Sequence, residues 1–419
     1  MIPLIRDCIS APVRRGALAR AMANASVSAL ASALAGALAC SGGDAAGPTH
    51  LESPTPAPIA RQETRLVAGG AHTCALSAGG TAFCWGNGSS GQLGNGSTTW
   101  QRSPVAVASG LTFTSLSAGE FSTCGMTAAG ATYCWGDVAS GPVPDSTPPT
   151  SGLAPTLVPS DVAFVRIASG DYHACGLGAT GAAYCWGFGF SGQLGDGTLI
   201  DYRGSASPVS GKLRFASLSG GYWHTCGVTV EGIGACWGNN NWGQLGDSTR
   251  TAHTAVAPVT GEITWATLAA GGRHSCGLST AGAAYCWGWN AFGQVGDGST
   301  ATRLSPVAVA MPNGVSFASI VSGFYHNCAL TADGAAYCWG FNDHGQLGDG
   351  TTSNRAAPVL VAGGVRFASL SAGVDHTCGM TTLGAAYCWG NNADGELGDG
   401  TTADAAVPTA VRFAAPASP

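Results

Sequence analysis

The sequence predicts an all-β protein: a single seven-bladed β-propeller with four strands and one disulfide hairpin in each blade. A hairpin motif recurs seven times at a spacing of 50 to 52 residues, and a period near 50 indicates an array of supersecondary units. Each unit carries four short strand patterns, the content of a propeller blade. The 65 glycines and 21 prolines suit short strands joined by many turns.

The hairpin is clearest at residues 326–340, HNCALTADGAAYCWG. Its three-residue loop ends at Gly334, a position that needs the left-handed conformation glycine adopts readily. In this register the numbers of facing residues sum to 666, so Cys328 lies opposite Cys338 in a non-hydrogen-bonded pair. Cα atoms in such pairs are about 4.5 Å apart, and a disulfide accepts roughly 4.4–6.8 Å. We therefore predict a cross-strand disulfide in every unit.

The two cysteines of each unit are ten positions apart. The predicted pairs are Cys74 with Cys84, Cys124 with Cys134, Cys175 with Cys185, Cys226 with Cys236, Cys276 with Cys286, Cys328 with Cys338, and Cys378 with Cys388. Two alternatives stay open: reduced core cysteines, or zinc sites in which His72 joins Cys74 on one strand face. Unit two has Ser122 in place of the histidine yet keeps both cysteines, which favours the disulfide. We expect the histidines to be hydrogen-bonded structural residues near the strand start; they are His72, His173, His224, His274, His326 and His376.

The propeller is expected to span residues 61–415. Each unit begins with an alternating strand, such as VRFASLSAG from Val365, followed by the hairpin, a glycine-rich loop and a fourth strand such as residues 358–361. The loop typically reads GQLGDG, but unit two replaces it with a proline-containing stretch. Residues 407–411 are expected to meet the early strand near Leu66 in a shared closing blade, which would remove exposed sheet edges. A tryptophan after each second cysteine is expected to pack between blades; these are Trp85, Trp135, Trp186, Trp237, Trp287, Trp339 and Trp389.

The N-terminus predicts export from a bacterial cell. Residues 1–39 form the expected signal, in which four arginines precede an alanine-rich run too weakly apolar for a transmembrane helix. Ala39-Cys40 resembles a lipoprotein junction, so we expect lipid on Cys40; Ala37-Leu38-Ala39 also fits ordinary cleavage, and free secretion is the alternative. Residues 40–60 read as a flexible tether. Export agrees with the disulfides, which persist outside the cytoplasm.

Composition and motifs argue against several functions. Only 10% of residues are charged and the net charge is −6, so the basic stripe of a nucleic-acid-binding protein is missing. Gly86-x-Gly88-x-x-Gly91 matches a dinucleotide fingerprint only as letters, within a repeat loop. Asp196 and its equivalents are expected to form Gly-Asp turns rather than calcium sites. We find no Gly-x-Ser-x-Gly, His-Glu-x-x-His or phosphate loop, and we expect no enzyme, cofactor or metal.

The units resemble the regulator of chromosome condensation repeat family. The resemblance rests on His-x-Cys-x-Leu, Tyr-Cys-Trp-Gly and Gly-Gln-Leu-Gly-Asp-Gly at a 50-residue period, and it covers about residues 65–413. It implies a seven-bladed propeller. It also implies nucleotide exchange on a small GTPase, which export and the shortage of basic residues argue against. Members similar to type II β-lactamase inhibitor are a closer parallel for an exported chain, although a fold does not name a target.

Positions that vary between units should carry what is particular to this protein. They are the pair before each histidine and the residues after each Trp-Gly. Both sets hold large aromatic side chains in units three to six, a pattern that favours a lopsided recognition patch on one face. The expected partner-binding residues are Tyr172, Phe188, Phe190, Tyr222, Trp223, Trp242, Trp289, Phe292, Phe324, Tyr325 and Phe341.

We therefore predict a monomeric, exported binding module that recognises a protein. The alternative for these aromatic residues is packing between neighbouring blades. For the whole protein, the alternatives are a surface or adhesion protein that binds polysaccharide and, more remotely, a nucleotide-exchange factor or an extracellular hydrolase. Membrane contact is expected only through lipid on Cys40.

Overall fold

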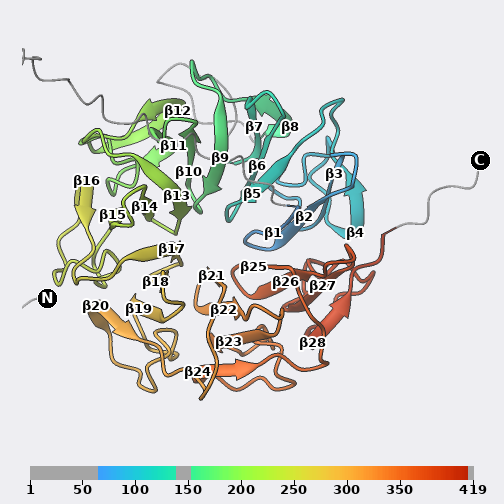
Figure 1. Cartoon of the computed structure of the whole chain (residues 1–419). Helices are drawn as coiled ribbons and strands as arrows, with labels where there is room; N and C mark the ends of the chain where they lie inside the picture. Colours follow the sequence, from blue (N-terminus) through green and yellow to red (C-terminus); the bar gives the residue numbers. More distant parts are fainter. Residues whose placement is uncertain (1–64, 138–151, 414–419) are drawn as a thin grey trace, which may run out of the picture. The chain divides into compact units, whose positions relative to one another are not determined.

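The computed structural model describes residues 65–137 and 152–413, which form seven sheets of four antiparallel strands each. Figure 1 shows the sheets arranged as blades around an axis. The predicted all-β, seven-bladed propeller is confirmed. The expected signal (1–39), Cys40 and the tether (40–60) lie outside the described residues. Within the described ranges, no helix has the length and apolar character that crossing a membrane requires.

The strands follow one another blade by blade. They are β1 (Leu66–Ala68), β2 (His72–Leu76), β3 (Ala82–Gly86) and β4 (Gln101–Ala106); β5 (Ser115–Ala118), β6 (Ser122–Met126), β7 (Thr132–Gly136) and β8 (Gly152–Leu157); β9 (Phe164–Ser169), β10 (His173–Gly178), β11 (Ala183–Gly189) and β12 (Ile200–Pro208); β13 (Phe215–Gly220), β14 (His224–Thr229), β15 (Gly234–Gly238) and β16 (His253–Pro258); β17 (Trp265–Ala270), β18 (His274–Ser279), β19 (Ala284–Gly288) and β20 (Arg303–Ala308); β21 (Ser319–Ser322), β22 (His326–Leu330), β23 (Ala336–Gly340) and β24 (Arg355–Leu360); β25 (Ser369–Ala372), β26 (His376–Met380), β27 (Ala386–Gly390) and β28 (Ala405–Ala410).

The hairpin register agrees with the prediction. Cys328 faces Cys338 across β22 and β23, and their Cα atoms are 4.1 Å apart. The loop is closed by a hydrogen bond from the Thr331 amide to the Ala335 carbonyl, and Gly334 has φ +82°. The turn residues and the cysteine spacing therefore select the same pairing.

Every predicted disulfide is present in the structure. Besides the bond between Cys328 and Cys338, the structure joins Cys74 with Cys84, Cys124 with Cys134, Cys175 with Cys185, Cys226 with Cys236, Cys276 with Cys286, and Cys378 with Cys388. The Cα atoms of these pairs are 4.0 or 4.1 Å apart, slightly closer than the predicted spacing. The disulfides occupy the cysteines that the zinc and reduced-thiol alternatives would have used.

The expected closing blade is wrong. Each sheet consists of four consecutive strands, and β28 pairs with β27 rather than with β1. The reason is that every unit starts with the strand nearest the axis and ends with the outermost one, so blade boundaries coincide with repeat boundaries. Blades seven and one instead meet through packing and isolated hydrogen bonds. The Ala68 amide donates to Ser371 Oγ (2.9 Å), and the Val374 amide donates to the Gly69 carbonyl (3.3 Å).

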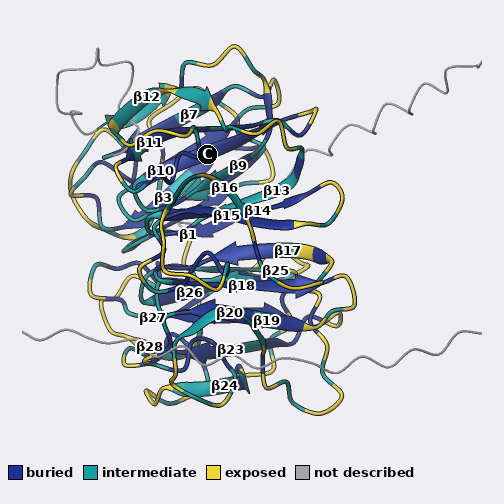
Figure 2. Ribbon diagram, turned by 90° about the vertical axis from the view of Figure 1, so that its left-hand side faces the viewer, coloured by how far each residue is buried: buried dark blue, intermediate teal, exposed yellow. Residues whose placement is uncertain are grey.

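The hydrophobic core lies between blades. In one example, Val67 and Leu93 of blade one pack with Phe113, Leu116 and the fully buried Trp135 of blade two. Figure 2 shows buried strands inside the molecule and exposed residues mainly in the connecting loops. The tryptophans thus pack between blades, as expected.

A belt of hydrogen bonds joins one blade to the next. Between blades six and seven, the Gln346 carbonyl accepts from Thr377 Oγ1 and from Trp389 Nε1, both at 2.9 Å. Since the Thr377 hydroxyl proton goes to this carbonyl, Nε2 of His326 donates to Thr377 Oγ1, at 2.8 Å. Blades seven and one use the same arrangement, because Thr73 and Trp85 both donate to the Glu396 carbonyl (2.8 and 2.9 Å). The belt therefore also closes the ring.

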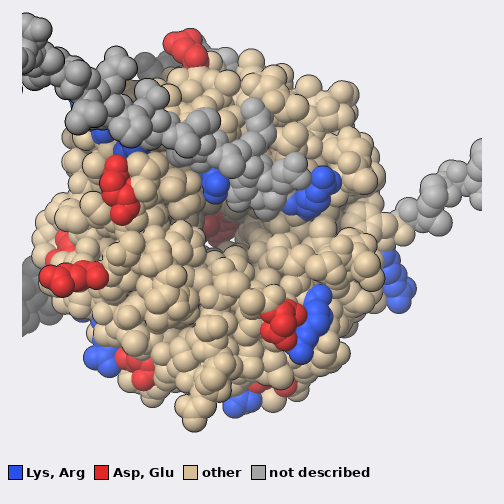
Figure 3. Space-filling view, viewed as in Figure 1, with Lys and Arg blue, Asp and Glu red and all other residues tan. Residues whose placement is uncertain are grey.

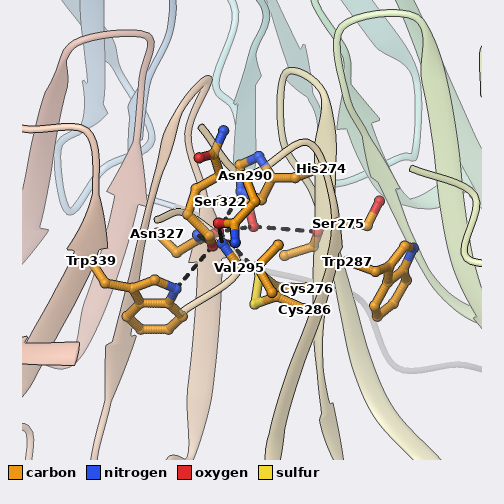
Figure 4. The surroundings of a disulfide bond; sticks show 12 residues. His274, Ser275, Cys276, Cys286, Trp287, Asn290, Val295, Ser322, Asn327 and Trp339 are labelled. Atoms are coloured by element: carbon orange, nitrogen blue, oxygen red, sulfur yellow. Dashed lines mark hydrogen bonds between the residues drawn. A yellow bond between two sulfur atoms is a disulfide. The ribbon is translucent and has the colours of Figure 1, made fainter. Parts of the chain in front are cut away.

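The belt histidines are structural residues at the strand starts, as expected. Figure 4 shows the joint at the Cys276–Cys286 disulfide, where His274 Nε2 donates to Asn327 Oδ1 (2.8 Å) and Asn327 Nδ2 donates to the Gln294 carbonyl (2.8 Å). Burial lowers the pKa of His274 to about 4, so the ring is neutral at physiological pH.

The belt is interrupted between blades two and three. Ser122 stands where other blades carry the histidine, and Ala174 stands where they carry the hydroxyl or amide partner. Trp186 is buried, but its Nε1 has no hydrogen-bond partner among the described residues. Among the described residues, this junction therefore has fewer polar bonds than the others, although the Ser169 amide donates to Ser117 Oγ across it at 2.7 Å.

Candidate functional site

The hairpin register brings both variable sets to one face. The first residue of each blade's second strand, a belt histidine or Ser122 in blade two, pairs with the Trp-Gly glycine of the third strand, as His326 does with Gly340. The residues before the histidine and after the glycine therefore emerge side by side. In blade three, the Phe188 amide donates to the Tyr172 carbonyl at 2.9 Å.

The eleven predicted aromatic residues form one connected group, which we call the aromatic cluster. Its centroid distances include Tyr172–Tyr222 (5.4 Å), Tyr172–Phe188 (6.1 Å), Phe188–Phe190 (6.2 Å), Phe190–Trp223 (5.6 Å), Tyr222–Phe324 (5.1 Å), Phe324–Tyr325 (4.4 Å), Trp289–Tyr325 (4.9 Å), Trp242–Trp289 (6.0 Å), Phe292–Trp289 (5.2 Å) and Phe292–Phe341 (4.6 Å). The contacts run without a break from blade three to blade six.

The cluster is accessible as well as packed. Phe190 is 44% exposed, and the other ten rings are half-buried. Full burial between blades would have removed the patch, and it is not observed. That these residues bind a partner stays a prediction.

Three further residues extend the cluster. Phe121 packs on Tyr172 (6.1 Å), and Tyr202 packs on Phe188 (5.5 Å). The Arg273 guanidinium lies 5.8 Å from the Trp242 ring centroid and 5.7 Å from that of Trp289, a cation–π arrangement. Phe121 and Arg273 stand in the variable pair before the histidine and could have been found there, whereas Tyr202 lies in the unusually long β12 and has no repeat signal.

A channel of about 300 Å³ runs along the axis and opens within this face. Its walls are the first strands of the blades, and Asp171, Tyr222, Phe324 and Val374 line it where those strands end. We call this end the axial mouth. Figure 3 shows a hollow at the axis with acidic atoms deep inside it, and both acidic and basic groups on the surrounding surface.

Two carboxyls near the axial mouth have perturbed acidity. Burial, and then the negative charge of Glu120, raise the pKa of Asp171 to about 8. Burial also raises the pKa of Glu120, against a hydrogen bond from the Tyr172 hydroxyl that lowers it. Both carboxyls therefore sit where a negative charge is poorly solvated.

The described residues contain no group of three or more His, Cys, Asp or Glu side chains placed to hold a metal ion. The Gly-Asp turns have internal partners instead. Asp297 accepts from the Ser299 amide at 3.0 Å and pairs with Arg303 at 2.6 Å. What the face offers is a half-buried aromatic surface beside an acidic channel mouth, which suits binding.

Seven four-stranded blades with one hairpin repeat each define the class of the protein as a repeat-built β-propeller. The chain belongs to the regulator of chromosome condensation (RCC1) repeat family. One model of that repeat matches residues 79–126, 281–330, 333–380 and 384–416, and a second matches 64–92, 164–193, 265–294, 317–346 and 367–396.

Relatives and solved structures agree with this assignment. The ultraviolet-B receptor UVR8 of Arabidopsis thaliana is 30% identical over 313 residues, which are 71% of this chain and 69% of UVR8. The probable E3 ubiquitin-protein ligase HERC4 of Homo sapiens is 29% identical over 209 residues, 48% of this chain but only 20% of HERC4. The chain thus spans about a fifth of that relative.

Two structures share the fold. Prp20p of Saccharomyces cerevisiae matches with a TM-score of 0.70 and 22% identity, over 85% of this chain and 88% of Prp20p. Human WBSCR16 matches with a TM-score of 0.68 and 20% identity, over 77% of this chain and 87% of WBSCR16.

Proposed function

We propose that this protein is a non-enzymatic, exported binding module that holds a protein partner on the aromatic cluster. The observation that carries the proposal is the unbroken run of half-buried rings across blades three to six. Large rigid aromatic side chains dominate the energetics of protein interfaces, and contiguous apolar patches on a soluble surface mark interaction sites.

The repeats themselves argue against loop packing as the sole reason for these rings. Blades one and seven have the same strands and disulfides, yet carry Gly70, Ala71 and Asn391 at the equivalent positions. A blade can therefore form without aromatic residues there. Yeast Prp20, of the same fold, has been crystallised with Kap60 bound, which supports a protein as the class of partner.

The test begins with capture of the partner from an extract of the exporting cell and its surroundings, followed by calorimetric titration. Truncation of Tyr222, Trp223 or Tyr325 to alanine should each weaken binding by about 2 kcal/mol or more, as expected of interface hot spots. Asn391→Ala is the matched control on the same face, outside the lining of the channel, and should cost little. Equal effects in both groups would contradict the proposal.

The same capture separates the alternatives. Retained polysaccharide with no retained protein would favour the adhesion function. Turnover of a captured substrate would instead favour a hydrolase. Nucleotide exchange on a small GTPase is not carried over to this chain, because the proposed export and the shortage of basic residues both argue against it.

Export and lipid anchoring through Cys40 belong to the same proposal. The Cys40→Ser variant should move the protein from the membrane fraction into the medium or periplasm, because the lipid would have no attachment point. Immunoblots of the fractions measure this. An unchanged distribution would leave ordinary cleavage after Ala39 as the mode of export.

A further inference from the structure

We infer that the axial mouth receives a cationic side chain, lysine or arginine, which a loop of the protein partner inserts between Tyr222 and the carboxyls of Asp171 and Glu120. This inference rests on the proposed function and adds the chemistry of the partner. It names a site, the axial mouth, that shares Tyr222 and Phe324 with the aromatic cluster and adds carboxyl groups to them.

The first support is the neighbourhood of the two carboxyls. Asp171 lines the channel, and Glu120 occupies the equivalent position in the preceding blade. The Tyr172 hydroxyl bonds to Glu120, and its ring lies 5.4 Å from that of Tyr222. Asp171 and Tyr222 thus line the opening, and Glu120 and Tyr172 lie next to them, so the four residues come from three consecutive blades.

The second support is that neither carboxyl has a cationic partner. No ion pair involves Asp171 or Glu120 in the part of the chain that the structure describes, and Glu120 Oε2 is buried without a hydrogen bond. On the outer loops the acids are paired, as Asp349 is with Arg355 at 2.7 Å. A poorly solvated carboxyl without a partner is costly, and an incoming cation would remove that cost.

The third support is the shape and chemistry of the walls. Beyond Asp171 the mouth is lined by Tyr222, Phe324, Val374 and glycines, none of which carries a charge. The faces of Tyr222 and Phe324 suit a cation–π contact with an organic cation. A volume of about 300 Å³ is at the lower limit of ligand pockets, room for one extended side chain but not for a folded element.

The rest of the face has the matching charge. Asp343 is exposed after Phe341, and Asp375 occupies the variable pair of blade seven. Asp404 is committed to His344 at 2.8 Å, and Arg273 is stacked on tryptophans. Excess negative charge on the face would speed the approach of a basic loop and orient it. A metal ion is the poorer occupant, since it needs more oxygen ligands than two carboxyls and offers nothing to the rings.

The experiment uses small probes on the mature protein, so that it does not depend on the partner. Butylammonium and butylguanidinium imitate the two side chains, and 1-butanol is the uncharged control. Calorimetry and carbon-13 shifts of labelled aspartate should show saturable millimolar binding of both cations but not of 1-butanol. Asp171→Asn should lower the affinity for both cations at least tenfold. Asp343 is an exposed acid of the same face, and Asp343→Asn should change that affinity less than twofold.

The pH dependence gives a second readout. The groups that face Asp171 are Glu120, Tyr172 and Tyr222, and a bound cation favours the ionised form of Asp171. Binding should therefore tighten as pH rises from 6 to 8.5, with release of protons, and Asp171→Asn should remove most of that dependence. Thermal melts check that each variant is folded.

Equal binding of 1-butanol, or cation binding that is unchanged in folded Asp171→Asn, would overturn the inference. The proposed function fails separately. Trp289 lies in the aromatic cluster away from the channel, so Trp289→Ala should weaken binding of the partner and leave butylammonium binding intact. If Asp171→Asn changes binding of neither the cations nor the partner while Trp289→Ala weakens binding of the partner, the proposed binding function is supported and the axial site is refuted.

Discussion

Acidification should destabilise this propeller through its belt histidines. Burial lowers the pKa of His72, His173, His224 and His326 to about 3, and that of His274 and His376 to about 4. The same rings titrate near 6.5 in the unfolded chain. Their contribution to stability is complete above about pH 6.5, because both states are then neutral. It is lost as pH falls, because only the unfolded chain takes up protons.

The size of this destabilisation at pH 5 is set by how far pH 5 lies below the pKa of about 6.5 that histidine has in the unfolded chain. At pH 5 the free energy of unfolding is lower by about 2 kcal/mol for each histidine, so the six histidines together lower it by up to about 12 kcal/mol. That is comparable with the whole stability of an ordinary domain. The raised pKa values of Asp171 and Glu396, about 8 and about 7, act in the opposite direction, since these folded carboxyls hold protons that the unfolded ones have released. Together they offset about 5 kcal/mol, roughly two fifths of the loss, between pH 7 and pH 5.

Urea unfolding followed by tryptophan fluorescence, with the disulfides intact, measures this at pH 7 and pH 5. The free energy of unfolding should fall by several kcal/mol at the lower pH. Blade two supplies the control, because Ser122 already stands in place of the histidine. His72→Ser should reduce the difference between the two pH values by about 2 kcal/mol. An unfolding free energy that is the same at both pH values, or a His72→Ser variant with the wild-type pH dependence, would refute the reasoning.

Two further predictions concern the cross-links and the interrupted joint. Each disulfide closes a loop of about eleven residues, so the double variant Cys328→Ser with Cys338→Ser should lose about 2.5–3 kcal/mol in urea unfolding. Thiol titration of the unfolded mature protein should find fourteen additional thiols only after reduction, and most of them reacting beforehand would show that the disulfides are absent. Amide exchange should be at least tenfold faster in β6 and β10, which carry Ser122 and Ala174 at the interrupted part of the belt, than in the equivalent β22 and β26. The reason is that local opening begins where polar bonds are fewest; uniform protection would contradict this.

The hairpins could be predicted because the sequence repeats the same local evidence seven times. The turn glycine, as at Gly334, sets a register, and Cys328 and Cys338 test it independently. The closure could not be predicted in the same way. A repeat period has no intrinsic start, so it does not show whether the boundary at Leu66 falls between blades or within one.

The site was predictable in part for a similar reason. Equivalent positions in neighbouring units lie side by side, so the sequence alone predicts that Tyr222 and Phe324 belong to one cluster. The same rule applies to Glu120 and Asp171, which stand at equivalent positions of neighbouring units, but their raised pKa values depend on burial, which the sequence does not give. The belt was hidden because its acceptor at Gln346 is a backbone carbonyl. Tyr202 was hidden because β12 has nine residues where the other fourth strands have six.

The joint between blades seven and one has consequences for how such a chain can be rearranged. Thr73 and Trp85 bind the Glu396 carbonyl as Thr377 and Trp389 bind that of Gln346. No strand crosses from one terminus to the other, so the order in which the blades are synthesised is immaterial to the finished ring. A circularly permuted chain that begins at blade four would rebuild every sheet intact. It would lose the linker between blades three and four and gain one between blades seven and one. Permutation that opens the chain between blades two and three should be tolerated least, since the described residues of that joint offer the fewest bonds to hold the ring closed.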